Sequence, residues 1–235
     1  MVGSKLGNVR WQRALLLASL TLLVAAPAAA QARIGFTVGP ALSQMAGDAV
    51  STSDSQWGIM LGLNLEYELS RDWQLDLELA LSQKGGDKVG IDGGSYDYRL
   101  DYFEFPITLS RLFWLNDGPW ALAPFAGFSV GLKTKCAIRP AGERDTEFET
   151  CTAETPGGGD TPGTFYGVPF GVAARRRFPG GSAMAIEARY TAGLTEGSEV
   201  GELMASTNTF TVMFSFGWSM DVRAHGTPSE PNPNR

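Results

Sequence analysis

Residues 57–69 have the sequence WGIMLGLNLEYEL, in which every second residue, from Trp57 to Leu69, is aliphatic or aromatic. The residues between them, from Gly58 to Glu68, are glycine, methionine, asparagine and glutamate. A period of two places successive side chains on opposite faces, which is the spacing of a β-strand and not of an α-helix. The stretch therefore predicts a strand with one strongly apolar face and one face of small and polar residues.

The same alternation recurs along the chain, and we count eight such segments. The expected strands cover residues 33–43, 56–69, 73–84, 97–113, 119–135, 164–178, 182–195 and 207–221. Short connections at 70–72, 115–118 and 179–181 alternate with long ones that are rich in Gly, Ser, Thr and Asp. Short turns on one side and long loops on the other are typical of an up-and-down transmembrane barrel, with the turns in the periplasm.

The apolar face decides between a soluble barrel and a membrane barrel. A narrow eight-stranded barrel has little room inside, so its inner face should carry the small residues. The large apolar side chains then lie outside, where a soluble barrel would show polar groups to water. Lipid offers no hydrogen-bond partner, so every backbone N–H and C=O group in the membrane must pair within the protein. A sheet meets this condition only as a closed barrel. We predict an all-β fold, an eight-stranded antiparallel up-and-down transmembrane β-barrel, as one domain over residues 31–221.

The two ends of the chain differ from this pattern. Residues 1–30 carry a positive leader, an almost wholly apolar run over 14–26 and small residues at 28–30. These are the parts of a cleaved signal peptide, and an apolar run of this length is short for a transmembrane helix. We expect the mature chain to begin at Gln31 and to be exported to the bacterial outer membrane. The polar, proline-rich residues 222–235 are expected to form a disordered tail.

Composition excludes several classes of function. The chain has 235 residues, 43% hydrophobic and 19% charged, which is enough for a full core. Its formal charge of −6 argues against nucleic acid as a partner. The single histidine, His225, lies in the polar tail, which disfavours Ser-His-Asp catalysis and His-ligated zinc. We expect no enzyme activity, no cofactor and no metal.

Ten charged residues fall on the small face of the expected strands. They are Glu66, Glu68, Asp76, Glu78, Glu104, Lys133, Arg175, Arg177, Glu187 and Arg189. The second and sixth strands of an eight-membered ring are opposite each other, so Glu66 and Glu68 should face Arg175 and Arg177. Since an unpaired charge in a narrow interior costs free energy, we predict a lattice of lumen ion pairs that blocks the periplasmic half. Acid–base catalysis is the alternative use of clustered carboxylates, but neither a nucleophile nor a histidine accompanies them.

Aromatic residues and cysteines add two further expectations. Aromatic rings near the short turns and the last strand end should form a girdle at the periplasmic interface. They are Tyr67, Trp73, Trp114, Trp120, Phe178 and Trp218. Cys136 and Cys151 both follow the fifth expected strand, and an even pair in an exported chain predicts a disulfide.

Four phrases resemble the porin-family outer-membrane β-barrel proteins, the small eight-stranded group related in shape to OmpA and OmpX. They are LALSQKGG at 79–86, LDYFEFPI at 100–107, PFAGF at 124–128 and AIEARYTAGLT at 185–195. The resemblance covers about residues 33–221 and implies a structural barrel without catalytic residues. Many such barrels end on an aromatic residue, whereas here Phe216 and Trp218 precede an extension of 14 residues after the barrel.

The leading hypothesis is a monomeric, non-enzymatic integral outer-membrane barrel with a plugged lumen, in contact with outer-membrane lipid. Its surface loops would serve adhesion, interaction with an extracellular ligand, or envelope integrity, because the irregular sequence lies on the loop side. One alternative is a small-solute channel. Another is an outer-membrane enzyme that uses the barrel-mouth carboxylates Asp97, Asp101 and Glu104.

Overall fold

The computed structural model describes residues 32–47, 50–91, 93–143, 145–152, 155, 163–194 and 206–220. The predicted signal peptide at 1–30 and the predicted tail at 222–235 lie outside these ranges. Within the described ranges, no helix is long and apolar enough to cross a membrane.

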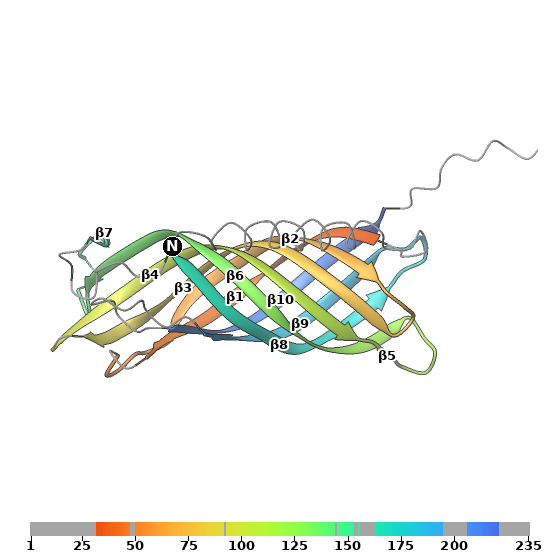
Figure 1. Ribbon diagram of the computed structural model, residues 1–235, viewed down its shortest axis with the longest axis horizontal. Helices are drawn as coiled ribbons and strands as arrows, with labels where there is room; N and C mark the ends of the chain where they lie inside the picture. Colours follow the sequence, from red (N-terminus) through yellow and green to blue (C-terminus); the bar gives the residue numbers. More distant parts are fainter. Residues whose placement is uncertain are drawn as a thin grey trace, which may run out of the picture. The chain divides into compact units, whose positions relative to one another are not determined.

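Eight long antiparallel strands make up the fold (Figure 1). They are β1 (Ala32–Ala46), β2 (Gln56–Glu68), β3 (Trp73–Ile91), β4 (Gly94–Arg111), β6 (Trp120–Pro140), β8 (Thr164–Arg177), β9 (Ala183–Gly193) and β10 (Ser206–Ser219). Each pairs with the next long strand along the chain, and β1 pairs with β10, so the ring closes. The two-residue strands β5 (Phe113–Trp114) and β7 (Glu149–Thr150) pair with β6. The predicted eight-stranded up-and-down barrel is confirmed.

The bulky apolar side chains point out of the barrel, as predicted. Leu63 exposes 59% of its surface and Phe214 exposes 40%, whereas the neighbouring Met213 and nearby Glu66 expose 2% and 3%. The inner wall is packed too closely for larger groups at several positions: a Cβ on Gly39 would collide with the carbonyl oxygen of Val212 on β10. An apolar belt of this extent on the outer surface suits hydrocarbon rather than water.

The short turns also lie where the sequence predicts them. Asn116 and Asp117 both have φ of 52°, and Gly180 and Gly181 have φ of 91° and 86°. Asn, Asp and Gly tolerate positive φ better than other residues, and such turns match the twist of a hairpin. Tight turns therefore join β4 with its continuation β5 to β6, and β8 to β9.

Two strands run well beyond their predicted ends on the loop side. β3 continues to Ile91 instead of residue 84, and β6 continues to Pro140 instead of residue 135. Their inward residues, with Met45 and Tyr98, form an apolar cluster that includes Val89 and Ile138. Burial of this cluster stabilises strand structure in both stretches, including residues 85–91, where three glycines and one aspartate predict a loop.

The outward orientation of Leu63 on β2 leads to a mutational prediction. We expect Leu63→Asp to lower the free energy of unfolding by about 2 kcal/mol, because a carboxylate near the middle of the apolar belt must enter hydrocarbon. Urea unfolding in lipid vesicles, followed by gel mobility without boiling, measures the effect. The control Leu63→Phe, which keeps the site apolar, should leave stability nearly unchanged. Equal stability of the aspartate variant and the parent protein would contradict the lipid-facing assignment.

Candidate functional site

The barrel interior carries a stacked series of ion pairs, which begins at the short-turn end. Arg33 of β1 contacts two carboxylates of β2, with Nε 3.0 Å from Glu66 and Nη1 2.5 Å from Glu68. Arg177 of β8 reaches Glu68 from the opposite wall at 2.7 Å. Two strands on opposite sides of the ring are thereby joined through one carboxylate.

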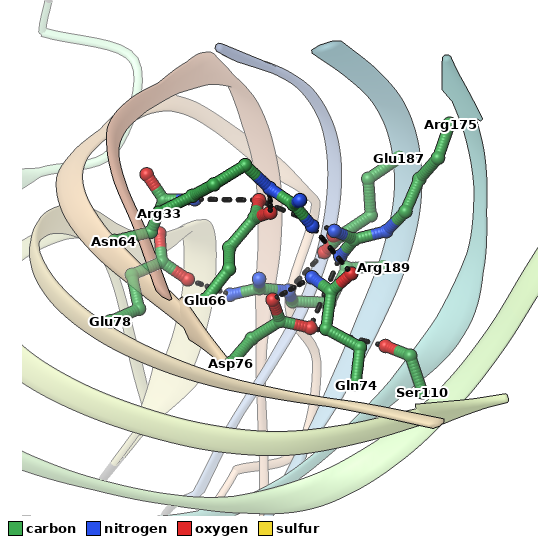
Figure 2. A network of polar contacts seen from close by, with 10 residues as sticks. All are labelled: Arg33, Asn64, Glu66, Gln74, Asp76, Glu78, Ser110, Arg175, Glu187 and Arg189. Carbon is green, nitrogen blue, oxygen red and sulfur yellow. Dashed lines mark hydrogen bonds and ion pairs between the residues drawn. The ribbon is translucent and has the colours of Figure 1, made fainter. Parts of the chain in front are cut away.

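Arg175 occupies the next level and bridges two acidic strands (Figure 2). Its guanidinium lies 3.2 Å from Glu66 of β2 and 3.1 Å from Asp76 of β3. Asp76 also accepts hydrogen bonds from Gln74 at 2.5 Å and from the hydroxyl of Ser110 at 3.1 Å. These contacts supply donors to a carboxylate that has left water, which is the condition for burying a charge without a large loss of stability.

Arg189 forms the third level. It extends from β9 across the ring to Glu78 of β3 at 2.8 Å, and it also contacts Glu187 of its own strand at 2.6 Å. Figure 2 shows the Arg189 and Glu78 side chains meeting within the ring of strands. β3 and β9 are opposite each other in the ring, so this pair spans the lumen as the β2–β8 pairs do.

Lys84 and Glu104 form a fourth level toward the loop side. The ammonium of Lys84 lies 2.9 Å from the carboxylate of Glu104, and both side chains are buried. Hydroxyl groups of Ser82 and Ser129 donate hydrogen bonds to Glu104. The Lys84 ammonium also lies 3.7 Å from the centroid of the Phe165 ring, where a cation–π contact adds to the ion pair.

The four levels together pair five cations with six carboxylates. Nine of the ten predicted lumen residues belong to them. The tenth, Lys133, lies on β6 opposite Tyr102, two positions beyond the register partner of Glu104. Two cations of the network, Arg33 and Lys84, are absent from the prediction, although both continue the small-residue side of their strands. That position in the alternation is the signal that identifies them.

Apolar side chains fill the interior beyond the charged levels. Leu100, Tyr102, Phe165 and the disulfide-bonded Cys136 pack together on the inner wall. The cluster that includes Met45, Val89 and Tyr98 lies further toward the loop side. The interior is therefore packed with ion pairs near the short turns and with hydrophobic groups near the long loops.

A family model described as the outer membrane protein beta-barrel domain matches residues 15–222. The chain belongs to this family. The closed ring, the outward apolar belt and the family match together identify a bacterial outer-membrane β-barrel protein. No curated protein sequence matches the chain.

Several solved structures align with most of this chain at low sequence identity. The attachment invasion locus protein Ail of Yersinia pestis, solved with a heparin analogue, is 15% identical with a TM-score of 0.40, covering 80% of this chain and 99% of that one. Neisserial surface protein A is 10% identical with a TM-score of 0.43, covering 79% and 96%. OprG of Pseudomonas aeruginosa is 12% identical with a TM-score of 0.42, covering 80% and 95%.

The aromatic rim of this outer-membrane barrel differs from its prediction at one residue. Trp73, Trp120 and Trp218 are exposed on the outer surface, and Tyr67 and Phe178 are partly exposed beside them. The guanidinium of Arg176 lies 5.5 Å from the Trp120 ring and 5.0 Å from the Phe178 ring. Cations and amphipathic rings of this kind suit a membrane interface.

Trp114 is the exception and faces inward. Its indole N–H donates a hydrogen bond to the carbonyl oxygen of Arg71 at 3.0 Å, and the guanidinium of Arg177 lies 4.2 Å from its ring. It packs on a cluster that contains Leu112 and Ala121. Assignment of Trp114 to the outer girdle is therefore wrong, because its even position in the strand alternation places it on the lumen side.

On the long-loop side, β3, β4 and β6 extend the barrel wall beyond the other strands. A disulfide joins Cys136 of β6 to Cys151, one residue after β7. The backbone N–H of Cys151 donates to the carbonyl oxygen of Cys136 at 3.2 Å, and β7 pairs with residues 137 and 138 of β6. β8 begins only at Thr164, opposite Leu132, so β7 covers part of the β6 edge that β8 does not reach.

Of the three barrel-mouth carboxylates, Glu104 lies in the lumen, whereas Asp97 and Asp101 lie four residues apart on the outer face of β4. Glu104 lies in the lumen with Lys84. Asp97 binds Arg139 at 3.0 Å and accepts the backbone N–H of Lys88 at 3.0 Å. Asp101 lies on the lipid-facing side of β4, since its neighbours in the strand point inward. Within the described residues, no group of three or more His, Cys, Asp or Glu is placed to hold a metal ion.

Proposed function

We propose that this outer-membrane barrel is a sealed, non-enzymatic anchor that presents an extracellular binding surface. The observation that carries the proposal is the filled interior, with ion pairs at four levels and apolar clusters beyond them. A solute channel needs a continuous aqueous path, whereas these side chains contact one another across the ring. The closed ring has no free long edge for lateral pairing, which supports a monomer.

Separation of the carboxylates supports the non-enzymatic assignment. A pair of acid–base catalysts must approach one substrate from positions that both can reach. Glu104 instead faces the lumen, on the other side of the barrel wall from Asp97 and Asp101, and those two are four residues apart along β4. Two of them are held by cations, in arrangements that neutralise charge.

The extracellular extension supports an interaction role. The Phe148 ring lies close to two guanidinium groups, with its centroid 4.5 Å from Arg99 and 4.4 Å from Arg139. Aromatic and arginine side chains are enriched where proteins bind partners. The disulfide ties the strand next to Phe148 to the barrel wall, so this surface is preorganised.

Conductance tests the sealed lumen. Purified protein in planar bilayers is expected to pass no current above the leak of the empty bilayer, since the charged levels and apolar clusters occupy the interior. Refolding is checked first by the mobility of the unboiled protein on a gel. Discrete channels from correctly folded protein would contradict the sealed anchor and favour the small-solute channel.

A bacterial adherence assay tests the proposed binding surface around Phe148. Bacteria that display the protein are compared with bacteria that display the Arg99→Ala, Phe148→Ala double variant, for attachment to cultured cells and immobilised matrix. The double variant should attach several-fold less, because it removes the stacked aromatic and one of its cations. Arg71→Ala, on the periplasmic turn, is the control and should attach as the parent does. Equal attachment by all three proteins would count against this surface.

A further inference from the structure

Two arginines on the outer wall near the short turns have no carboxylate partner. Arg111 is the last residue of β4, and Arg176 is the last but one of β8. Both point out of the barrel, since the buried residues beside them, Ser110, Leu112 and Arg175, point inward. Of the residues that the structure describes, no carboxylate lies within ion-pair distance of either guanidinium. Each therefore carries a positive charge that the protein leaves unbalanced.

Two aromatic rings lie beside the guanidinium of Arg111. Its register partner on β3 is Trp73, and the guanidinium lies 5.8 Å from the centroid of the Trp73 ring. The ring of Phe113, two residues further along the chain, has its centroid 5.1 Å from the same guanidinium. Both rings are exposed on the outer surface of the barrel. These cation–π contacts hold the guanidinium in place without neutralising its charge.

Arg176 has the same surroundings as Arg111. Its register partner on β6 is Trp120, whose ring centroid lies 5.5 Å from the guanidinium, and Phe178 follows by two residues at 5.0 Å. β6 pairs with β4 on one side and with β8 on the other, so a single strand separates the two arginines in the wall. An arginine, a tryptophan opposite it and a phenylalanine two residues later thus occur twice at the same end of the barrel. We call them the Arg111 site and the Arg176 site.

Both sites lie where the apolar belt ends on the short-turn side. Leu109 precedes Arg111 by two residues on β4, and Leu122 follows Trp120 by two residues on β6. Both leucines are exposed on the outer surface. Tryptophan favours the boundary between headgroups and acyl chains, and the short turns of such barrels lie in the periplasm. Each guanidinium therefore lies at headgroup depth in the periplasmic leaflet, whose lipids are phospholipids.

We propose that the Arg111 site and the Arg176 site each bind the phosphate of an anionic phospholipid, of the phosphatidylglycerol type, in the periplasmic leaflet. The planar guanidinium has paired N–H donors that match two phosphate oxygens. The exposed side chains of Leu109 and Leu122 contact the upper part of the acyl chains. Because no carboxylate balances the guanidinium, a headgroup with net negative charge binds better than a zwitterionic one, which brings its own ammonium to the site.

Native mass spectrometry of the intact protein from detergent tests both sites with phosphatidylglycerol, phosphatidylethanolamine and phosphatidylcholine of identical acyl chains. The parent should retain up to two phosphatidylglycerol molecules, each in about fivefold preference to either zwitterionic lipid, which corresponds to about 1 kcal/mol for one cation at the membrane surface. Arg111→Gln and Arg176→Gln should each remove one of the two, and the double variant should lose the preference. Arg71→Gln is the matched control and should keep it, because Arg71 is an exposed arginine of a short turn that is already paired with Asp117.

Phe113→Leu with Phe178→Leu supplies an independent test, because it keeps both charges and removes one ring from each site. It should lower the preference for phosphatidylglycerol about twofold, the effect of one exposed cation–π contact on each guanidinium. Equal retention of the three lipids by the parent, or an unchanged preference in the double glutamine variant, would overturn the proposal.

Inorganic phosphate distinguishes a lipid site from a general anion site. Added in excess to the parent, it should displace little phosphatidylglycerol, because the acyl chains also contribute to binding. Gel mobility without boiling shows first that each variant is folded. Complete displacement of the lipid by inorganic phosphate would overturn the assignment to a phospholipid.

Discussion

Replacement of Arg175 by methionine is expected to lower the free energy of unfolding by about 3–5 kcal/mol, the cost of removing one partner from a buried ion pair. Arg175 contacts both Glu66 and Asp76, and these carboxylates have little access to water. Methionine keeps much of the side-chain volume, so the loss reports charge and hydrogen bonding rather than a cavity. Urea unfolding in lipid vesicles, followed by tryptophan fluorescence and gel mobility, measures it.

An exposed pair provides the matched control. Arg71 and Asp117 are joined at 3.1 Å on the periplasmic turns, with side chains that are 71% and 92% exposed. Arg71→Met should therefore change stability by less than about 1 kcal/mol. Adding Asp76→Asn to Arg175→Met should recover part of the loss, because Asp76 has no other cation partner, whereas Glu66 keeps Arg33. A loss for Arg175→Met no larger than that for Arg71→Met would refute the plugged-lumen account.

Strand alternation explains why much of the lumen could be predicted. Once β2 and β8 are assigned to opposite walls, the short turns fix the depth of Glu66, Glu68, Arg175 and Arg177, because each residue lies a set number of positions from a turn. Alternation also gives the outward face of Leu63 without knowledge of any contact. These are properties of strand geometry and need only local sequence.

The remaining features depend on contacts between distant segments. β3 continues to Ile91 because Val89 packs against Met45 and Ile138, which are far away in the sequence. The bulge at Thr134 arises from the pairing of β4 with β6, and nothing in either strand alone specifies it. Trp114 could have been placed correctly from the sequence. Its even number in the strand alternation indicates the lumen, whereas only its position near a turn suggests the outer girdle.

Removal of the Cys136–Cys151 disulfide should loosen the extracellular extension while the transmembrane barrel stays folded. The bond closes a loop with a sequence separation of 15 residues, which corresponds to about 3 kcal/mol in the chain-entropy account. That difference raises the open population of β7 by about two orders of magnitude. Cleavage by chymotrypsin after Phe148, which directly precedes β7, measures the opening in vesicles with the loops outside.

The physical reason lies in the short pairing of β7 with β6. Only residues 149 and 150 pair with β6, so the disulfide supplies most of the restraint on this segment. The Cys136→Ser, Cys151→Ser variant, and the parent with dithiothreitol, should both be cleaved faster, with gel mobility of the uncut barrel unchanged. Lys88→Ala is the control, because it removes an exposed ion pair with Asp54 elsewhere in the extension. This variant should be cleaved at the same rate as the parent. Equal cleavage of oxidised and reduced protein would mean that packing around Phe148, rather than the covalent bond, holds the segment against β6.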